Sequence, residues 1–179
     1  MIMDNTEIIQ ALKDCNAVQF GDFTLASGQK SNFYIDIKKA STDPKTLKII
    51  ADYIARLIPT VTDGSEIIIG GVELGGVPIA TAVSLSTEKP LLIIRKATKE
   101  YGTKSRYVGD LDTAKEIILM EDVTTSGGSV KKAILALKED GANIKKVITI
   151  VDRESGAADS LKEAGVELIP LVCSSELVE

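Results

Sequence analysis

The sequence predicts an α/β fold with a mostly parallel central sheet flanked by helices. Apolar runs rich in Ile and Val alternate along the chain with segments of helical period, an order that is typical of this fold class. The runs are continuous, which favours strands covered on both faces. A length of 179 residues suits one compact domain, so residues 1–179 are expected to fold as a single unit.

The N-terminal part is expected to carry one helix and a small cap. Residues 4–15 are acidic and amphipathic, a pattern that predicts a helix. Gln19–Lys39 has the character of extended pieces joined by turns. Residues 1–40 are therefore expected to contribute a small N-terminal hood over the sheet.

Further helices and the main strands are expected to follow in alternation. Asp43-Pro44 opens a helix that runs to about Leu57, and Pro78–Ser86 forms another, because proline suits a first helical turn. Apolar residues recur at helical spacing over residues 130–137, and Gly141 stands where a C-terminal cap would. The four clearest strands are Glu66–Gly70, Leu91–Arg95, Glu116–Glu121 and Lys146–Val151.

Residues 97–113 show no steady period and are expected to form a long loop, of the kind that serves as a mobile active-site lid. Positive charge gathers at this loop in a chain whose net charge is −5. The clustered residues are Arg95, Lys96, Lys99, Lys104 and Arg106. The cluster indicates a small anionic ligand, although a solvated surface run would have the same composition.

Composition argues against several classes of protein. The chain has no histidine, which removes Ser-His-Asp catalysis, the Cys-His pair and His-ligated zinc. Its negative charge argues against general nucleic-acid binding. The N-terminus does not have the pattern of a signal peptide, and no apolar stretch approaches the ~20 residues that span a bilayer. Neither a nucleic acid nor a membrane is an expected partner, and a cytoplasmic location is expected.

The two cysteines, Cys15 and Cys173, lie far apart in the sequence and match no metal-ligand or redox spacing. The sequence leaves a disulfide between them open. Two buried thiols in a reducing cytosol are the favoured interpretation.

The strongest chemical signal follows the strand Glu116–Glu121. Two adjacent carboxylates, Glu121 and Asp122, stand where this strand ends, and a Gly/Ser/Thr-rich turn leads from there into a helix. In open α/β sheets, ligands sit outside the carboxyl ends of the strands. Such a turn offers backbone N–H groups and hydroxyls to a phosphate. The same residues could merely cap the helix, but the paired acids favour a sugar-phosphate ligand.

The whole segment EIILMEDVTTSGGS, Glu116–Ser129, closely resembles the phosphoribosyl-diphosphate motif of type I phosphoribosyltransferases. The resemblance implies that Glu121 and Asp122 contact the ribose hydroxyls. It also implies that Thr124–Ser129 cradles the 5′-phosphate, and that the loop Gly70–Gly76 binds the diphosphate. The donor-binding residues it implies are Glu73, Leu74, Gly75, Arg95, Lys96, Lys99, Tyr101, Glu121, Asp122, Val123, Thr124, Thr125, Ser126, Gly127, Gly128 and Ser129.

Three other segments resemble the orotate phosphoribosyltransferases within this family. They are Phe20–Asp36, which resembles the N-terminal signature, Arg95–Gly102, which resembles the catalytic loop, and Asp152–Gly156, which resembles the base-binding turn. By this resemblance Thr125 and Arg153 contact orotate, whose carboxylate suits a planar guanidinium. An ion pair of Arg153 with Asp152 or Glu154 is the structural alternative.

Aromatic residues and two departures from the family pattern bear on the same site. Phe33 and Tyr34 could shelter the flat ring of the base, but aromatics in a strand are more often part of the core. Tyr101 stands where the family usually has His, and it cannot be cationic. Ala26 stands where many bacterial relatives have Lys, which puts one contact to the donor in question.

The resemblance implies transfer of ribose 5-phosphate from 5-phosphoribosyl 1-diphosphate to orotate, with Mg²⁺ held mainly by substrate and water rather than directly by protein. Lys99, Glu121 and Asp122 would be the catalytic residues. The family also implies a homodimer in which lid residues are shared between subunits. Alternatives are a purine phosphoribosyltransferase of the same fold, a non-catalytic regulator that senses phosphoribosyl diphosphate, and a plain nucleotide-binding module.

Overall fold

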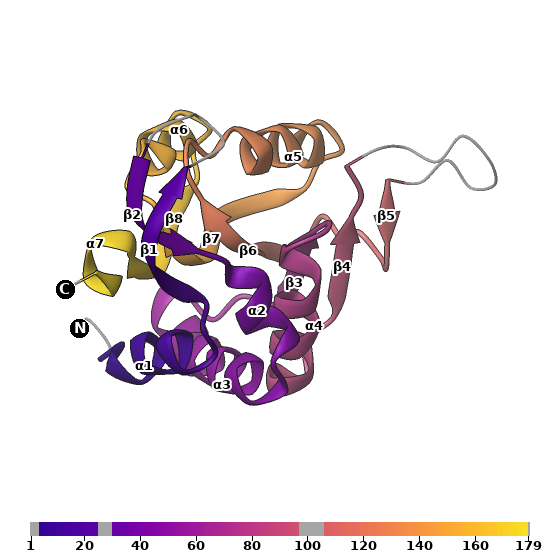
Figure 1. The fold of residues 1–179 in the computed structure, drawn as a ribbon. Helices are drawn as coiled ribbons and strands as arrows, with labels where there is room; N and C mark the ends of the chain where they lie inside the picture. Colours follow the sequence, from indigo (N-terminus) through magenta and orange to yellow (C-terminus); the bar gives the residue numbers. More distant parts are fainter. Residues whose placement is uncertain (1–3, 25–29, 97–105, 179) are drawn as a thin grey trace.

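A computed structural model describes residues 4–24, 30–96 and 106–178. Its centre is a six-stranded sheet (Figure 1), in which every described pair of neighbours is parallel except that of the short edge strand β5 with β4. In spatial order the strands are β5 (Tyr107–Val108), β4 (Leu91–Ile94), β3 (Ile67–Val72), β6 (Glu116–Thr124), β7 (Asn143–Asp152) and β8 (Glu167–Cys173). The predicted mostly parallel sheet is confirmed.

Helices cover both faces of this sheet (Figure 1), which explains why its strands are continuously apolar. Alternate residues of β6 enter two different core clusters: Ile118 and Met120 pack on one face, and Ile117 and Leu119 on the other. The helices packed in the first cluster are α1 (Thr6–Asp14), α2 (Ile37–Thr42), α3 (Pro44–Val61) and α4 (Gly76–Thr87). The second cluster contains residues of α5 (Gly128–Glu139) and α6 (Ala157–Glu163).

The N-terminal hairpin forms a two-stranded antiparallel sheet of its own, made of β1 (Val18–Thr24) and β2 (Lys30–Ile35). Its base, Val18 and Ile35, is buried in the first core cluster, while Phe20 at 63% and Tyr34 at 42% are exposed. The expected extended stretch therefore ends at Ile35. Residues 37–39, which were included in that stretch, belong to the helix α2, because the Asp36 carboxylate accepts a hydrogen bond from the Lys38 N–H and caps this helix.

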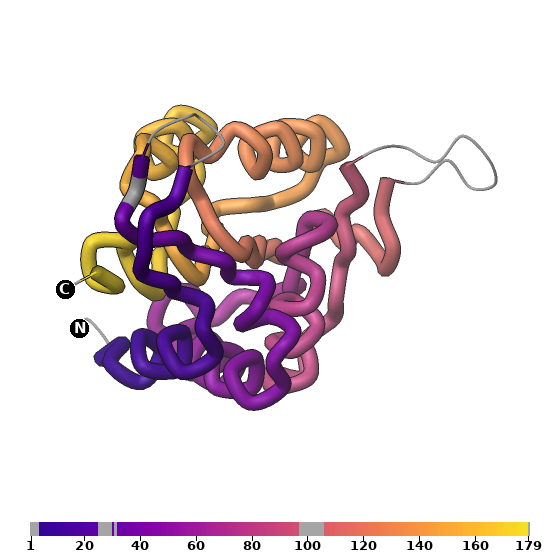
Figure 2. The backbone as a smooth tube through the Cα atoms, viewed as in Figure 1, coloured from indigo at the N-terminus to yellow at the C-terminus, as the bar shows by residue number. Residues whose placement is uncertain are grey.

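The described chain begins and ends side by side (Figure 2), with the short helix α7 (Ser174–Leu177) near the start of α1. The Asn5 side-chain amide donates to the Leu171 carbonyl and to the Glu176 carboxylate, each at 3.0 Å. No helix within the described ranges is long and apolar enough to cross a bilayer.

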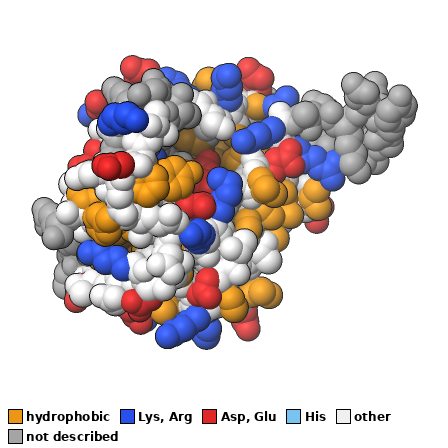
Figure 3. Space-filling view, in the orientation of Figure 1, with side chains coloured by type: hydrophobic (Ala, Val, Ile, Leu, Met, Phe, Trp, Pro, Cys, Tyr) orange, Lys and Arg blue, Asp and Glu red, His pale blue; other side chains and the backbone are white. Residues whose placement is uncertain are grey.

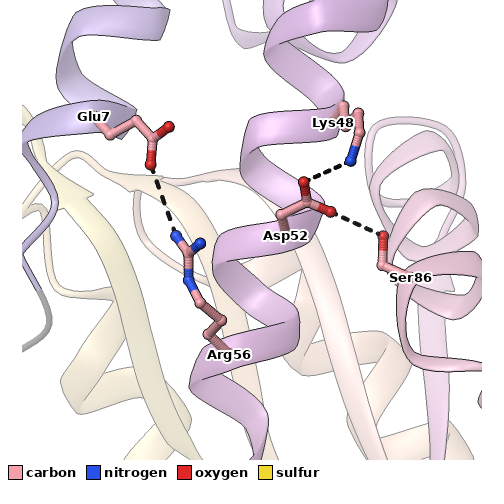
Figure 4. Close-up of polar contacts among 5 residues, drawn as sticks. All are labelled: Glu7, Lys48, Asp52, Arg56 and Ser86. Carbon is pink, nitrogen blue, oxygen red and sulfur yellow. Dashed lines mark hydrogen bonds and ion pairs between the residues drawn. The ribbon is translucent and has the colours of Figure 1, made fainter.

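An ion pair and a hydrogen bond on the surface join α3 to its neighbouring helices, and a second ion pair lies within α3 (Figure 4). Arg56 on α3 lies 3.7 Å from Glu7 on α1, and Asp52 accepts from Lys48 at 2.7 Å and from Ser86 of α4 at 3.5 Å. All these side chains are exposed, so the pairs contribute little stability.

A buried ion pair connects the amino ends of β6 and β7. Lys146 Nζ lies 3.2 Å from Glu116 Oε1, and the two side chains are 15% and 2% exposed. It lies at the edge of the sheet opposite to the loops described below.

Several sequence predictions need correction. Two elements were missed. The strand β8 was not predicted because Pro170 interrupts its strand pattern, and the helix α6 was not predicted because it has only 7 residues. Proline is tolerated in β8 because this is an edge strand. The predicted loop 97–113 contains the strand β5, and residues 97–105 lie outside the described ranges. Both cysteines are free, but they are half-buried rather than buried.

Candidate active site

Three loops gather at one edge of the sheet because they follow three adjacent parallel strands. Residues 73–75 follow β3, residues 125–127 follow β6, and residues 153–156 follow β7. Parallel neighbours end at the same edge, and the β6–β7 register pairs Thr124 with Asp152. The segments that the sequence analysis selected separately thus form one site, in the position where open α/β sheets bind ligands.

The paired acids lie within β6, which extends to Thr124 rather than ending at Glu121. As successive strand residues, their side chains point to opposite faces of the sheet. Asp122 is buried at 8% exposure and accepts a hydrogen bond from the Val123 N–H at 2.8 Å. Glu121 is partly buried and accepts from the Asp122 N–H at 3.2 Å. Burial, and next the adjacent Asp122 carboxyl, raise the pKa of Glu121 well above its ordinary value.

The loop after β6 surrounds a small cavity of about 150 Å³. Gly127 has a left-handed backbone with φ of 74° and serves as the N-cap residue of α5. Within the described residues, no side chain caps the N-terminus of this helix. The alternative that the Thr and Ser side chains merely cap the helix is therefore not observed. The helix therefore presents free backbone N–H groups to the cavity. The lining residues are Glu121, Val123, Thr124, Thr125, Ser126, Gly127, Gly128, Ser129 and Val130.

The loop after β3 packs directly against the acids. A Cβ atom at Gly75 would overlap the Asp122 carboxylate, and one at Gly76 would overlap the Met120 carbonyl oxygen. Glu73 accepts a hydrogen bond from the Lys96 N–H at 2.6 Å, which connects this loop to the end of β4. Leu74 is 74% exposed, and the peptide bond between Glu73 and Leu74 is cis.

A second cavity, of about 670 Å³, has a basic lining. It lies between the end of β4, the start of α5 and the segment before β5. Its charged lining residues are Arg95, Lys96, Arg106 and Lys132, and Ser129 also lines it. Figure 3 shows basic side chains gathered in this part of the surface, toward the upper right. The sequence analysis placed Arg106 in the basic cluster but missed Lys132, whose position one helical turn after Ser129 could have indicated it.

The end of β7 and the turn after it are held to Thr124, the last residue of β6, by two hydrogen bonds. The Arg153 N–H donates to the Thr124 carbonyl at 2.8 Å, and the Thr124 hydroxyl donates to the Asp152 carboxylate at 2.9 Å. Glu154 accepts hydrogen bonds from Ser174 and Ser175. In the described ranges no carboxylate forms an ion pair with the Arg153 guanidinium. The alternative of a pair with Asp152 or Glu154 is therefore not observed.

Some predicted residues are not brought into this arrangement. Tyr34 packs on Phe23 in the hairpin, with ring centroids 5.7 Å apart, and Phe33 packs against the first core cluster. Lys99, Tyr101, Lys104 and Ala26 lie outside the described residues.

Comparison with known proteins agrees with this geometry. Residues 38–167 match the phosphoribosyl transferase domain family. The chain is 62% identical over 173 residues to the orotate phosphoribosyltransferase of Methanosarcina mazei, which covers 97% of this chain and 91% of that protein. The chain belongs to the orotate phosphoribosyltransferase family. The enzyme of that name from Methanocaldococcus jannaschii is 49% identical, over 96% of each chain.

Solved structures of the family share the fold. The orotate phosphoribosyltransferase of Mycobacterium tuberculosis superposes with a TM-score of 0.83 at 26% identity, over 97% of this chain and 98% of that one. The orotate phosphoribosyltransferase of Aeropyrum pernix gives 0.79 at 28% identity, over 96% of each chain. An adenine phosphoribosyl transferase of Trypanosoma brucei gives 0.67 at 18% identity, covering 92% of this chain and 79% of that one, and shares the fold alone. Membership of the orotate family therefore replaces the purine alternative.

Proposed function

We propose that this chain transfers ribose 5-phosphate from 5-phosphoribosyl 1-diphosphate to N1 of orotate, giving orotidine 5′-phosphate and diphosphate. The observation that carries the proposal is that the Arg153 backbone N–H is bound to Thr124 at the end of β6, while its guanidinium is unpaired with any described carboxylate. A planar guanidinium binds a carboxylate bidentately. Orotate carries a carboxylate and the purine bases do not, so Arg153 together with Thr125 suits orotate.

The remaining loops suit the donor. Glu121 and Asp122 accept hydrogen bonds from the ribose hydroxyls, and residues 124–129 cradle the 5′-phosphate with the N–H groups at the start of α5. Residues 73–75 face the diphosphate. The side chains of Arg95, Lys96, Lys99 and Tyr101 neutralise the diphosphate or donate to it.

The reaction then needs positioning and charge stabilisation more than covalent help from the protein. The C1–O bond of the donor breaks with its electron pair leaving on the diphosphate. N1 of orotate, after losing its proton to solvent, supplies the pair that forms the new N1–C1 bond. Lys99 on the lid acts on the departing diphosphate, and closure of the lid excludes water that would hydrolyse the donor.

Magnesium fits the donor set of this site, because Glu73 directly follows β3, Glu121 lies near the end of the adjacent strand β6, and carboxylate oxygens are ligands that Mg²⁺ prefers. These residues would orient the ion through water, while the substrate supplies its other ligands. When bound, the ion supplies positive charge to the diphosphate.

The proposal also includes a homodimer in which the lid of one subunit, residues 97–113, completes the site of its partner. A cytoplasmic location belongs to it as well. Two free thiols suit a reducing compartment.

The first test offers the protein phosphoribosyl diphosphate and Mg²⁺ with orotate, adenine, guanine, hypoxanthine or uracil in parallel, and measures the nucleotide formed. Orotidine 5′-phosphate in the orotate reaction alone is the expected outcome. Turnover of another base would contradict the assignment of the base-binding turn. Tight donor binding without turnover of any base would indicate the regulator.

Arg153→Ala tests the residue on which the proposal rests. The KM for orotate should rise by at least about tenfold, since one bidentate charged contact is worth 1.5–3 kcal/mol, while the KM for the donor changes little. Arg56→Ala is the matched control, because Arg56 is an exposed arginine on α3 that pairs with Glu7. An equal rise of the KM values for orotate and for the donor would contradict the role of Arg153.

A further inference from the structure

Glu154, the residue after Arg153, is bonded to the C-terminal helix. Its carboxylate accepts hydrogen bonds from the Ser175 N–H at 2.9 Å, the Ser174 hydroxyl at 3.1 Å and the Ser175 hydroxyl at 3.2 Å. These bonds, that of the Ser175 N–H foremost, lower the pKa of Glu154 below its usual value, so the side chain is charged at neutral pH.

The helix that holds Glu154 is itself fixed at several points. The Cys173 N–H donates to the Glu176 carboxylate at 2.6 Å, which closes the first turn of α7. The other oxygen of Glu176 accepts from Asn5, at the start of α1. Leu177 is fully buried in the first core cluster. Because α7 is anchored to the core and to α1, it can serve as a fixed support for the turn after β7.

The backbone at Glu154 needs such a support. Its φ is 56°, in the left-handed region, which costs a residue with a Cβ free energy. A conformation of this kind persists only where surrounding contacts enforce it. On one side the Arg153 N–H is bound to Thr124, and on the other the Glu154 carboxylate is bound to α7. Arg153 therefore stands between two fixed points.

The same bonds keep two opposite charges apart. Glu154 follows Arg153 directly in the sequence, yet both of its oxygens accept from α7 rather than from the guanidinium. A carboxylate free to reach Arg153 would compete with a ligand carboxylate for it. Holding Glu154 on α7 thus leaves the guanidinium available.

We propose that Glu154 is a positioning residue for the base: together with Ser174 and Ser175 it clasps the turn after β7 to α7 and so orients Arg153 toward the carboxylate of orotate. The assignment rests on the proposed function for its ligand, but the clasp is a property of the protein alone. In this assignment Glu154 acts through Arg153 and contacts neither substrate itself.

Glu154→Ala tests the clasp in steady-state kinetics with both substrates varied. The KM for orotate should rise about tenfold, the order of loss that a misplaced binding group causes, while the KM for the donor changes less than about twofold. Glu154→Gln, whose amide oxygen can still accept from the Ser175 N–H, should recover most of the loss. Glu167→Ala, which removes an exposed glutamate of β8, is the control. If Glu154 had a merely structural role, Glu154→Ala would raise the KM values for both substrates together. That result, or a KM for orotate that stays high in Glu154→Gln, would overturn the proposal.

A second measurement does not depend on turnover. Hydrogen exchange at the Ser175 amide should be faster in Glu154→Ala than in wild type and unchanged in Glu167→Ala; equal rates would show that no clasp exists in solution. If Glu154→Ala fails to fold, the double variant Ser174→Ala/Ser175→Ala should raise the KM for orotate in the same direction, and an unchanged KM would overturn the proposal. If wild type does not use orotate while the exchange result holds, the proposed function fails and the clasp stands.

Discussion

At the scale of single residues, the adjacent acids Glu121 and Asp122 of β6 have different surroundings. Asp122 is buried beneath Gly75 and bonded to the backbone, whereas Glu121 lines the cavity formed by the loop after β6. Without a ligand, the negative charge of the Glu121 carboxylate is unfavourable in this site. A hydrogen bond donated by a ribose hydroxyl can stabilise that charge. Such a site sacrifices stability for binding.

The raised pKa of Glu121 predicts a pH-dependent stability. A carboxyl whose folded-state pKa exceeds the unfolded value contributes fully below the unfolded value of 4.5, and this contribution is lost as pH rises through the folded pKa. Glu121→Gln should therefore match wild type near pH 4.5 and be more stable than wild type at pH 9 by at least about 1 kcal/mol, since a shift of one pKa unit corresponds to about 1.4 kcal/mol. Denaturant unfolding of the free protein at both pH values measures the difference. A constant difference at both would show that Glu121 titrates normally.

The sequence predicted these acids by type and position but not their contacts. The motif marks Glu121 and Asp122, yet the packing of Gly75 on Asp122 arises only when β3 and β6 become neighbours. The unpaired state of Arg153 likewise depends on α7, which the sequence analysis did not predict. Long-range pairing of this kind leaves no local pattern in the chain.

At the scale of elements, α5 contributes more to the site than its N-terminus. Lys132, on its second turn, lines the basic cavity with Arg95, Lys96 and Arg106. The helix thus presents N–H groups and a lysine to the same region, both of which favour anions.

Lys132→Ala should weaken donor binding through charge alone. The KM for phosphoribosyl diphosphate should rise about threefold to tenfold at low salt, and the effect should shrink as salt screens the charge. The KM for orotate should stay within about twofold. Lys145→Ala, an exposed lysine near the amino end of β7, is the matched control. An equal effect of both substitutions would indicate net charge rather than the cavity.

Element prediction worked where a pattern was long. The helices α3 and α4 and the strands β6 and β7 were found with ends a few residues out, because their apolar patterns persist over several turns or a whole strand. The strand β5 has only 2 residues and exists through pairing with β4 and the bond from the Tyr107 hydroxyl to Asp140. Neither contact could be inferred from residues 106–113 alone.

At the scale of the whole molecule, the proposed sharing of the lid has a direct test. Lys99→Ala and Asp122→Asn should each be nearly inactive as homodimers. If the lid of one subunit completes the site of the other, a mixed dimer holds one site with both residues intact. Equal mixing with free subunit exchange should then recover about a quarter of wild-type activity. Mixed dimers that form but recover no activity would show that each lid serves its own subunit.

The sheet order separates two kinds of recognition that a transferase must combine. In the proposed function the loops after β3 and β6 bind the sugar phosphate, and the turn after β7, which is bonded to α7, binds the base. Substitutions in the turn after β7 and in α7 could therefore change the acceptor base during evolution, while the loops that bind the donor stay the same. This modularity offers a physical reason why one scaffold can serve several nucleobases.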